Sequence, residues 1–245
     1  MVYNCVHYSC CGEDMSEPGG VPRVGVAVDV VCCRLRPSET AWQLEVLLVR
    51  RLPPPFAWQW ALPGGVLHAD ERLADCARRL LRERTGLVES YLEQLYTFDA
   101  LDRDPLGRTL SVAYYALFRL DASEPEAGRN VAAARWWAIH HLPAGGMLAF
   151  DHARIIQAAH ERLRHKLDYA PVAFQMLPPS FTMTQLRRVY EAIQERPYDP
   201  TNFPRAMQAR FPGLTVVPGQ HDRASKRPAR LFRYDASPTT LSAGR

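Results

Sequence analysis

The chain has 245 residues, of which 47% are hydrophobic and 23% are charged. This composition is typical of a folded globular protein, and it excludes a disordered chain or a coiled coil. The length allows either one large domain or two small ones. No apolar run is long enough to cross a bilayer, and no basic segment followed by an apolar core opens the sequence. We therefore expect neither a membrane span nor a secretory signal.

Charge is unevenly distributed along the chain. There are 30 basic and 26 acidic residues, which gives a net charge of +4. Residues 172–245 contain 11 basic and 5 acidic residues, whereas residues 1–171 contain 19 and 21. A nearly neutral body followed by a basic C-terminal third predicts that this third binds a polyanion.

The six cysteines predict a reducing environment. Two of them form the adjacent pair Cys10-Cys11 and two form Cys32-Cys33, a spacing that is untypical of a disulfide framework. We therefore expect a cytoplasmic protein. The cysteines between residues 5 and 11 have no second pair at a metal-site spacing, so we predict no zinc site there. Residues 1–20 are expected to be a disordered extension.

Hydrophobic patterns predict the elements of a first domain, residues 21–171. The β-branched segment 24–35 is typical of a strand buried on both faces, and 42–49 of its antiparallel partner. An amphipathic helix is expected over 69–85, with Gly86 as its left-handed C-terminal cap. The pattern also predicts strands at 91–100, 109–120 and 131–139 and a helix at 152–166.

A different pattern predicts a second domain over residues 172–238, followed by a disordered tail at 239–245. Thr182 and Gln185 have the spacing of a capping box, which marks the start of a helix. A second helix ends near Phe211. Two short strands at 214–217 and 229–234 follow, joined by a basic loop. Helix, turn, helix and hairpin in this order predict a winged helix-turn-helix.

A family motif lies where the first domain's first helix is expected. Gly65, Glu71, Arg79, Glu83 and Gly86 fall at the spacing of the Nudix box. Over about residues 22–145 the chain resembles the Nudix family. The resemblance implies an α/β/α sandwich with a mixed sheet, and the whole chain is then of the α+β class, with a C-terminal winged helix-turn-helix.

The chain departs from this family where its enzymes bind metal. Nudix hydrolases carry glutamates at the positions of residues 80, 83 and 84, on one helical face, and these hold Mg²⁺. This chain has Leu80, Glu83 and Arg84. One glutamate beside a fixed cation is a poor site for a hard divalent ion, so we predict no metal site and no catalytic residues. Glu71, Arg79 and Glu83 are instead expected to fix the loop onto the helix through charge-assisted hydrogen bonds.

A degenerate box followed by a winged helix resembles the Nudix-related transcriptional regulators of NAD metabolism, the NrtR family. Matching stretches lie at 96–105, 111–115, 150–153, 181–186 and 227–234. The resemblance implies a homodimeric regulator, a repressor of NAD synthesis or salvage genes, that binds a palindromic operator in double-stranded DNA. It also implies a sensor for ADP-ribose or a related nucleotide, which acts as an effector and not as a cofactor.

The sensor's nucleotide site is expected to work without metal. We expect Arg84 to supply the counter-charge to a diphosphate, and either Trp58 or Trp60 to stack on a base. The candidate effector-binding residues are Arg51, Trp60, Gly64, Gly65, Arg79, Glu83, Arg84, Arg103 and Arg108.

The second helix of the C-terminal domain is the candidate recognition helix. Pro204 restricts where it begins, because a proline in a helix interior removes a hydrogen bond. A cap at Thr201 or Asn202 places Pro204 in the first turn, where no donor is lost. Asn202, Arg205 and Gln208 lie at a spacing of three and are then expected to face bases. Basic residues elsewhere in this domain are expected to contact phosphates. The candidate DNA-binding residues are Arg187, Arg188, Thr201, Asn202, Arg205, Gln208, Lys226, Arg227 and Arg230.

Two other functions fit parts of this pattern. One is an active Nudix hydrolase of ADP-ribose or another nucleoside diphosphate derivative, with a tail that binds nucleic acid. The other is an inactive interaction module without a DNA target. The missing acidic residues argue against the first, and the basic helix and wing argue against the second.

Overall fold

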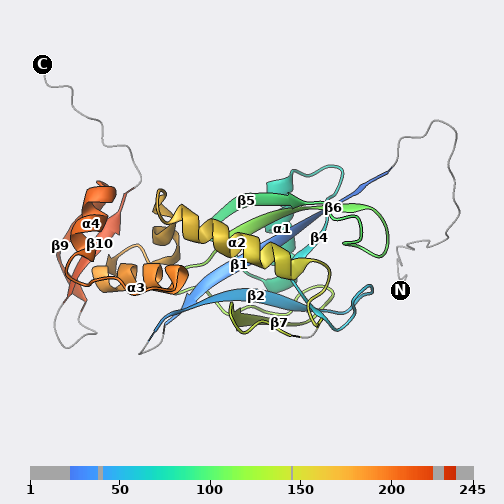
Figure 1. Ribbon diagram of the computed structural model, residues 1–245, viewed down its shortest axis with the longest axis horizontal. Coiled ribbons are helices and arrows are strands. Elements are labelled where there is room, and N and C mark those ends of the chain that lie inside the picture. Colours follow the sequence, from blue (N-terminus) through green and yellow to red (C-terminus); the bar gives the residue numbers. More distant parts are fainter. Residues whose placement is uncertain (1–22, 38–40, 145, 223–228, 236–245) are drawn as a thin grey trace, which may run out of the picture.

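The computed structural model describes residues 23–37, 41–144, 146–222 and 229–235. The extension and tail expected at residues 1–20 and 239–245 lie outside them. Two units lie end to end along the long axis of the molecule (Figure 1). The larger one contains a mixed sheet between helices, and the smaller one contains two helices and a hairpin.

A seven-stranded mixed sheet forms the larger unit within the described residues. The central strand β1 (Gly25–Arg36) pairs in parallel with β6 and antiparallel with β2 and β4. Strands β3 and β7 pair with β2, and β5 pairs with β6. The predicted antiparallel pairing of the first two strands is confirmed. The other strands are β2 (Gln43–Arg51), β3 (Trp60–Ala61), β4 (Gly64–Val66), β5 (Tyr91–Phe98), β6 (Thr109–Leu117) and β7 (Val131–Ala138).

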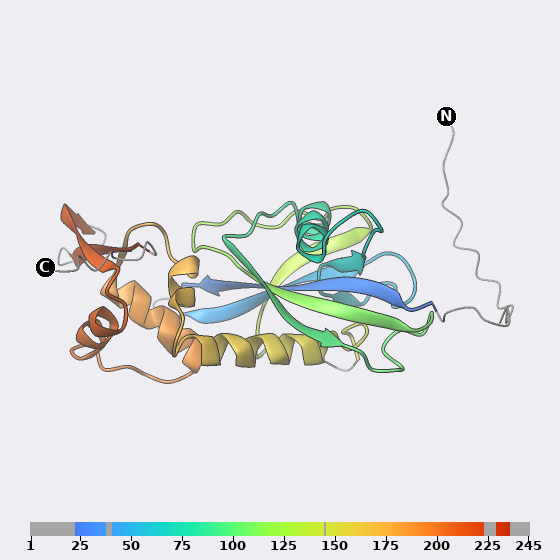
Figure 2. The ribbon, with the colours of Figure 1, turned by 90° about the horizontal axis from the view of Figure 1, so that it is seen from above.

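Helices α1 (Leu73–Thr85) and α2 (His152–Lys166) cover opposite faces of this sheet (Figure 2). Successive side chains of β1 point to the two faces in turn. Val30 and Cys32 accordingly lie in the core beneath α1, while Val31 and Cys33 lie in the core beneath α2. The prediction of a strand buried on both faces is confirmed, and so is the α/β/α sandwich.

Helix α1 begins four residues later than the pattern predicted. It starts at Leu73, after Arg72, and residues before it form the loop that carries Glu71. Periodicity could not show this, because the Glu71 side chain bonds to Arg79 of the helix while its backbone lies in the loop before it. Its end is as predicted: Gly86 has a φ of 69°, and its N–H donates to the carbonyl of Arg82.

Some short strands were missed and some bounds differ. Strands β3, β4 and β8 (Phe181–Thr182) have two or three residues, too few to show an alternating pattern. Strand β9 (Leu214–Asp222) continues past the predicted end at 217, because it pairs with β10 (Ala229–Tyr234) as far as Asp222. The strands predicted to end at 100, 120 and 139 end at 98, 117 and 138.

The smaller unit is a winged helix-turn-helix, as predicted. A 3₁₀ helix (Pro171–Met176) leads into it, followed by α3 (Met183–Gln194) and α4 (Phe203–Arg210). The capping box is confirmed, since Thr182 Oγ1 accepts from the N–H of Gln185 at 3.1 Å and Gln185 Oε1 accepts from the N–H of Thr182 at 2.8 Å. Asn202 occupies the N-cap position of α4 without a side-chain cap bond, and Pro204 lies in the first turn. Asp199 Oδ1 accepts from the N–H groups of Thr201 and Asn202 just before the helix.

The two units share one hydrophobic core. Leu35 and Leu44 of the sheet belong to the same cluster of buried residues as Leu186 and Val189 of α3. Polar contacts join the units as well, because Gln194 Nε2 donates to the carbonyl of Arg164, at 2.9 Å, in α2. The winged helix is thus packed onto the sheet and α2, and is not a tethered appendage.

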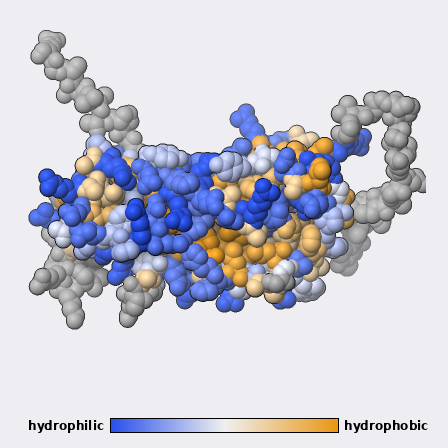
Figure 3. Space-filling model, in the orientation of Figure 1, coloured by the Kyte–Doolittle hydropathy of each residue, from blue (hydrophilic) through white to orange (hydrophobic). Residues whose placement is uncertain are grey.

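The surface differs between the two units. Figure 3 shows apolar side chains gathered over the region of β2 and β7, and a mainly hydrophilic surface over the winged helix. No helix within the described residues is long and apolar enough to span a membrane.

Leu186→Ala should lower the free energy of unfolding by about 2–5 kcal/mol, because it opens a cavity in the shared core. Calorimetry should show one unfolding transition, shifted to lower temperature. Thr184→Ala, an exposed change on the same helix, is the control and should alter stability by about 0.5 kcal/mol or less. Two transitions of which only one shifts would contradict the shared core.

Candidate functional site

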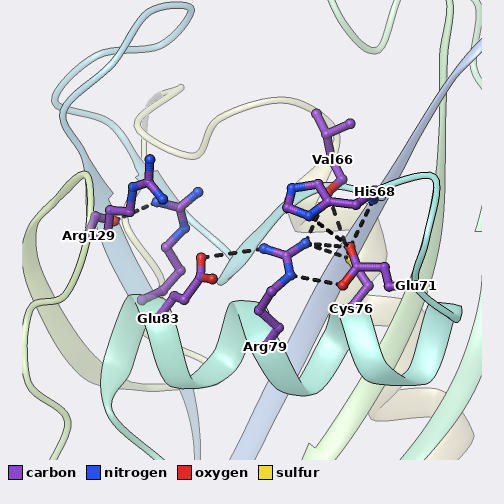
Figure 4. A network of polar contacts seen from close by, with 8 residues as sticks. Val66, His68, Glu71, Cys76, Arg79, Glu83 and Arg129 are labelled. Atoms are coloured by element: carbon purple, nitrogen blue, oxygen red, sulfur yellow. Dashed lines mark hydrogen bonds and ion pairs between the residues drawn. The ribbon is translucent and has the colours of Figure 1, made fainter. Parts of the chain in front are cut away.

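An arginine on α1 ties the loop before the helix to the helix itself (Figure 4). Arg79 Nε donates to Glu71 Oε2 at 2.9 Å, and Arg79 Nη2 donates to Glu71 Oε1 at 2.6 Å. On its other side Arg79 Nη1 lies 3.4 Å from Glu83 Oε2. Arg79 also donates to the carbonyl of Val66 in β4. The predicted structural lock of Glu71, Arg79 and Glu83 is confirmed.

Charge-assisted hydrogen bonds between Glu71 and Arg79 shift the pKa values of both side chains. Hydrogen bonding to Arg79 lowers the pKa of Glu71 from 4.5 to about 2, against the opposing effect of burial. The same bond raises the pKa of Arg79. Glu71 is therefore a fixed anion at neutral pH, and its charge is matched by Arg79.

The two glycines before the helix permit close packing. A Cβ atom at Gly64 would lie 2.1 Å from Asp29 Oδ1, and one at Gly65 would lie 2.8 Å from Leu80 Cδ2. Both distances are shorter than van der Waals contact. At Gly64 the Cβ atom would also lie 2.9 Å from the carbonyl oxygen of Val28, so a glycine is needed for β4 to pass this close to β1.

Arginines gather beside this loop, at the end of α1. Arg84 Nη1 donates to the carbonyl of Arg129 at 2.5 Å, and its Nη2 lies 3.5 Å from the position that a Cβ atom would take at Gly65. Arg129 is held in turn, because its N–H donates to the carbonyl of Glu83 at 2.8 Å. Arg51 Nε donates to the carbonyl of Pro55, and its guanidinium lies over the ring of Phe150.

These cations are partly desolvated and close enough to affect one another. Burial lowers the pKa of Arg84, and the positive charges of Arg129 and Arg79 lower it further against the pull of Glu83. Burial also lowers the pKa of Arg51, and the charge of Arg84 lowers it further against the opposing charges of Asp29 and Asp104. A group of arginines that repel one another in this way favours an added anion.

The residues at the family's metal positions do not fit Mg²⁺. Leu80 is 1% exposed and packs in the core, and Arg84 carries a positive charge. The carboxylate of Glu83 faces Arg79. No group of three or more His, Cys, Asp or Glu side chains in the described part of the chain could hold a metal ion. A hard divalent ion needs several oxygen ligands, and this helix face offers one carboxylate.

Other candidate effector residues lie in different surroundings. Arg103 is buried with its side chain 3% exposed, and Nη2 lies 3.0 Å from Asp151 Oδ1 and 3.4 Å from Asp29 Oδ2. Two carboxylates thus already match its charge. Arg108 Nη1 donates to the carbonyl of Asp99 at 2.6 Å.

The two tryptophans considered for base stacking differ in exposure. Trp60 packs edge-on against Trp137, with ring centroids 5.3 Å apart, and borders the core. Trp58 is 57% exposed, and Arg50 lies over its ring at 5.5 Å. Trp58 is therefore the more exposed of the two, although Arg50 lies over its ring.

Sequence reasoning missed a buried polar network at the start of α2. Ser111 Oγ donates to Asp29 Oδ2 at 2.6 Å, and the N–H of Leu62 donates to His152 Nδ1 at 2.9 Å. Burial raises the pKa of Asp29, but the neighbouring His152, Ser111 and Arg103 outweigh it, so that the pKa lies below its usual value. No local motif could reveal this network, because its members lie on different strands, loops and a helix.

The predicted recognition helix exposes the expected face. Phe203 and Met207 of α4 are buried, while Asn202, Arg205 and Gln208 are exposed. Thr201 and Arg230 are exposed too. Lys226 and Arg227 lie outside the described residues.

Two candidate phosphate contacts lie apart from this face. Arg187 Nη1 is paired with Glu191 Oε1 on the same helix. Arg188 is half-buried, with its guanidinium 6.0 Å from the ring of Trp42 in the larger unit. Spacing along α3 could not predict this, because it follows from how the two units pack.

Comparison with known proteins matches the two units to two families. Residues 25–159 match the NUDIX domain, and residues 173–234 match the NrtR DNA-binding winged helix domain. The ADPR responsive transcriptional repressor NtrR of Acinetobacter baylyi is 35% identical over 194 residues, which cover 78% of this chain and 76% of that protein. The chain belongs to the NrtR family.

Solved structures of this family resemble the chain. NrtR of Shewanella oneidensis complexed with a 27mer DNA has a TM-score of 0.71 and 32% identity, and the match covers 86% of this chain and 93% of that one. The NUDIX domain of the same NrtR complexed with ADP ribose has a TM-score of 0.50 and 34% identity, over 58% of this chain and 90% of that one.

Arg79→Lys should raise the pKa of Glu71 from about 2 towards its ordinary value of 4.5, because lysine cannot donate two parallel hydrogen bonds. The depressed pKa stabilises the fold above pH 4.5, and this contribution is lost as the pH falls towards 2. Carboxyl NMR titration measures the shift. Arg78→Lys on the same helix is the control, since Arg78 pairs with Glu89. An unchanged Glu71 titration in Arg79→Lys would refute the lock.

Proposed function

We propose that the protein is an ADP-ribose-responsive transcriptional repressor of NAD synthesis or salvage genes. This proposal rests on one observation: Leu80 and Arg84 stand at two of the three positions where the family's enzymes need carboxylates, on a domain that shares its core with a DNA-binding winged helix. The repressor of Acinetobacter baylyi and the Shewanella oneidensis complexes with DNA and with ADP ribose support both halves of this proposal.

The effector site proposed here lies between the Gly64-Gly65 loop and the end of α1. Arg84 and Arg51 donate to backbone carbonyls, and the phosphates of a diphosphate would offer charged acceptors instead, which guanidinium groups bind through paired hydrogen bonds. Trp58 offers an exposed ring to stack on a base. Arg103 and Arg79 do not contact the nucleotide in this proposal, because their guanidinium groups already pair with carboxylates. They hold the neighbouring segments in place.

The same site argues against hydrolysis. Attack of water on a diphosphate in this family relies on a metal that several carboxylates hold. Of Leu80, Glu83 and Arg84 only Glu83 offers a carboxylate, and that carboxylate faces Arg79, which supports the proposal. We therefore propose that the NUDIX domain binds its nucleotide without cleaving it, in the reducing cytoplasm that the cysteines predict.

The DNA interface proposed here consists of α4 and the wing. Asn202, Arg205 and Gln208 face bases from α4, and Arg230 on β10 contacts phosphates. A homodimer would present two such helices to a palindrome. The apolar surface over β2 and β7 is of the kind that a second copy would cover (Figure 3).

Arg84→Ala should weaken ADP-ribose binding by roughly tenfold or more, since a charged hydrogen bond contributes about 1.5–3 kcal/mol. Calorimetry on the full chain, with EDTA present, measures the affinity. Arg82→Ala removes an exposed arginine two residues earlier on α1 and should change nothing. Binding that requires Mg²⁺, or release of AMP on adding it, would overturn the proposal of a metal-independent sensor.

Arg205→Ala should cost roughly 1–3 kcal/mol on the cognate operator and little on random DNA, because it removes a base contact. Arg230→Ala should weaken both DNAs alike and reduce the slope of log affinity against log salt by about one unit. Fluorescence anisotropy across salt concentrations measures both effects.

Arg119→Ala is the matched control for these DNA variants, because Arg119 is an exposed arginine of the larger unit. It should leave both affinities unchanged. If Arg205→Ala and Arg230→Ala reduce binding to every sequence equally, α4 does not read bases. If neither variant changes binding, the winged helix does not bind DNA through this surface.

A further inference from the structure

A buried histidine at the start of α2 contacts two segments beside the proposed nucleotide site. The His152 side chain is 3% exposed, so a bound nucleotide would not touch it. Its ring nitrogens face different segments. Nδ1 accepts from the N–H of Leu62 at 2.9 Å, and Nε2 lies 3.5 Å from Asp29 Oδ1 in β1. The imidazole therefore joins the segment before the glycine loop to the central strand.

These contacts fix the hydrogen on the imidazole ring. A ring nitrogen that accepts a hydrogen bond carries no proton, so the single hydrogen of the neutral ring is on Nε2, towards Asp29. Asp29 is held in turn, because Ser111 Oγ donates to Asp29 Oδ2 at 2.6 Å and Arg103 Nη2 lies 3.4 Å from the same oxygen. The orientation of His152 is thus set by partners on both sides of its ring.

The contact at Nδ1 supports the glycine loop. Leu62 directly precedes the loop at residues 63–65. Asp29 and Gly64 are opposite each other in the pairing of β1 with β4, and the carboxylate lies against the glycine backbone. Without the Nδ1 acceptor, the N–H of the buried Leu62 would lose its partner. His152 thus holds the start of the loop, and its neighbour Asp29 lies against the middle.

The ring of His152 supports Arg51 through a second aromatic ring. Phe150 packs against His152 with ring centroids 5.2 Å apart, and the Arg51 guanidinium lies 4.9 Å from the Phe150 centroid. Phe56 packs edge-on against Phe150 at 4.7 Å. Phe150 has a left-handed φ of 53°, which is strained for a bulky side chain and persists only where contacts hold it. The position of Arg51 therefore depends on a ring that His152 supports.

We propose that His152 is a positioning residue of the nucleotide site, which orients the glycine loop through Leu62 and the Arg51 guanidinium through Phe150. This inference rests on the proposed function, in which the loop and Arg51 border the diphosphate. A guanidinium binds phosphate oxygens through paired hydrogen bonds that have a fixed geometry. A buried residue that sets this geometry adds to the affinity without touching the nucleotide.

ADP-ribose binding to the full chain, measured by calorimetry with EDTA present, tests this role. His152→Asn keeps an acceptor for Leu62 but removes the ring, and Phe150→Leu keeps apolar bulk but removes the ring beside Arg51. Each should weaken binding by roughly three- to thirtyfold, the range for residues that act through a neighbour. Phe150→Tyr retains the ring and should bind as the unaltered chain does. Thermal unfolding checks that every variant is folded at the temperature of the measurement.

Double variants separate positioning from general damage to the fold. In an Arg51→Ala background, His152→Asn should have little further effect, because the guanidinium that its ring orients is absent. In an Arg84→Ala background the two losses should be independent, since His152→Asn keeps the bond to Leu62 and hence the loop. His152→Ala removes both contacts, so it should weaken binding more than His152→Asn, and this difference should persist in Arg51→Ala. Phe118→Leu removes a ring from the core beneath α1 and is the matched control, with unchanged binding.

The outcomes distinguish this role from the function on which it rests. Absence of ADP-ribose binding in the unaltered chain would contradict the proposed function itself. Binding that His152→Asn and Phe150→Leu leave unchanged would overturn the positioning role alone, and so would an equal loss from His152→Asn with and without Arg51. Nitrogen NMR of the nucleotide-free chain adds a readout that needs no ligand. It should show the ring hydrogen of His152 on Nε2, and a hydrogen on Nδ1 would also overturn the role.

Discussion

Helix α3 belongs to the winged helix, yet its apolar side chains lie in the core that β1, β2 and α2 form. Leu186, Val189 and Ile193 are fully buried in this cluster together with Leu35 and Leu44. Burying such side chains stabilises a fold by about 1.5–3 kcal/mol each. The DNA-binding unit therefore has a fixed place on the sensor, and both the sensor and the DNA interface depend on this packing.

Helix α2 connects the two ends of the molecule through polar contacts. At its start, Asp151 pairs with Arg103 and His152 accepts from the N–H of Leu62, close to the glycine loop. At its end, the carbonyl of Leu167 accepts from the hydroxyl of Tyr190 in α3. One straight helix thus touches the residues beside the proposed nucleotide site and the helix that supports the proposed recognition helix (Figure 2).

Helix α1 has the place of the family's helix although two of its metal positions carry other residues. The lock of Glu71 and Arg79 keeps the loop on the helix, so the glycines still approach β1 and α1 closely. Two of the three positions that hold metal carboxylates in the family's enzymes carry Leu80 and Arg84 instead, and the third keeps Glu83. Leu80 adds to the core, and Arg84 adds positive charge beside Arg129. The fold of this helix and its loop can therefore be kept while the residues at the metal positions change.

Local signals in the sequence determined the elements whose causes are local. The capping box at Thr182 and Gln185, the left-handed cap at Gly86 and the start of α4 before Pro204 each depend on neighbouring residues, and each was predicted. Only the tertiary structure decided which arginines pair with carboxylates. Arg103 meets Asp29 and Asp151 across separate elements, and spacing along one element carries no information about such partners, because burial and charge pairing arise when distant segments pack together.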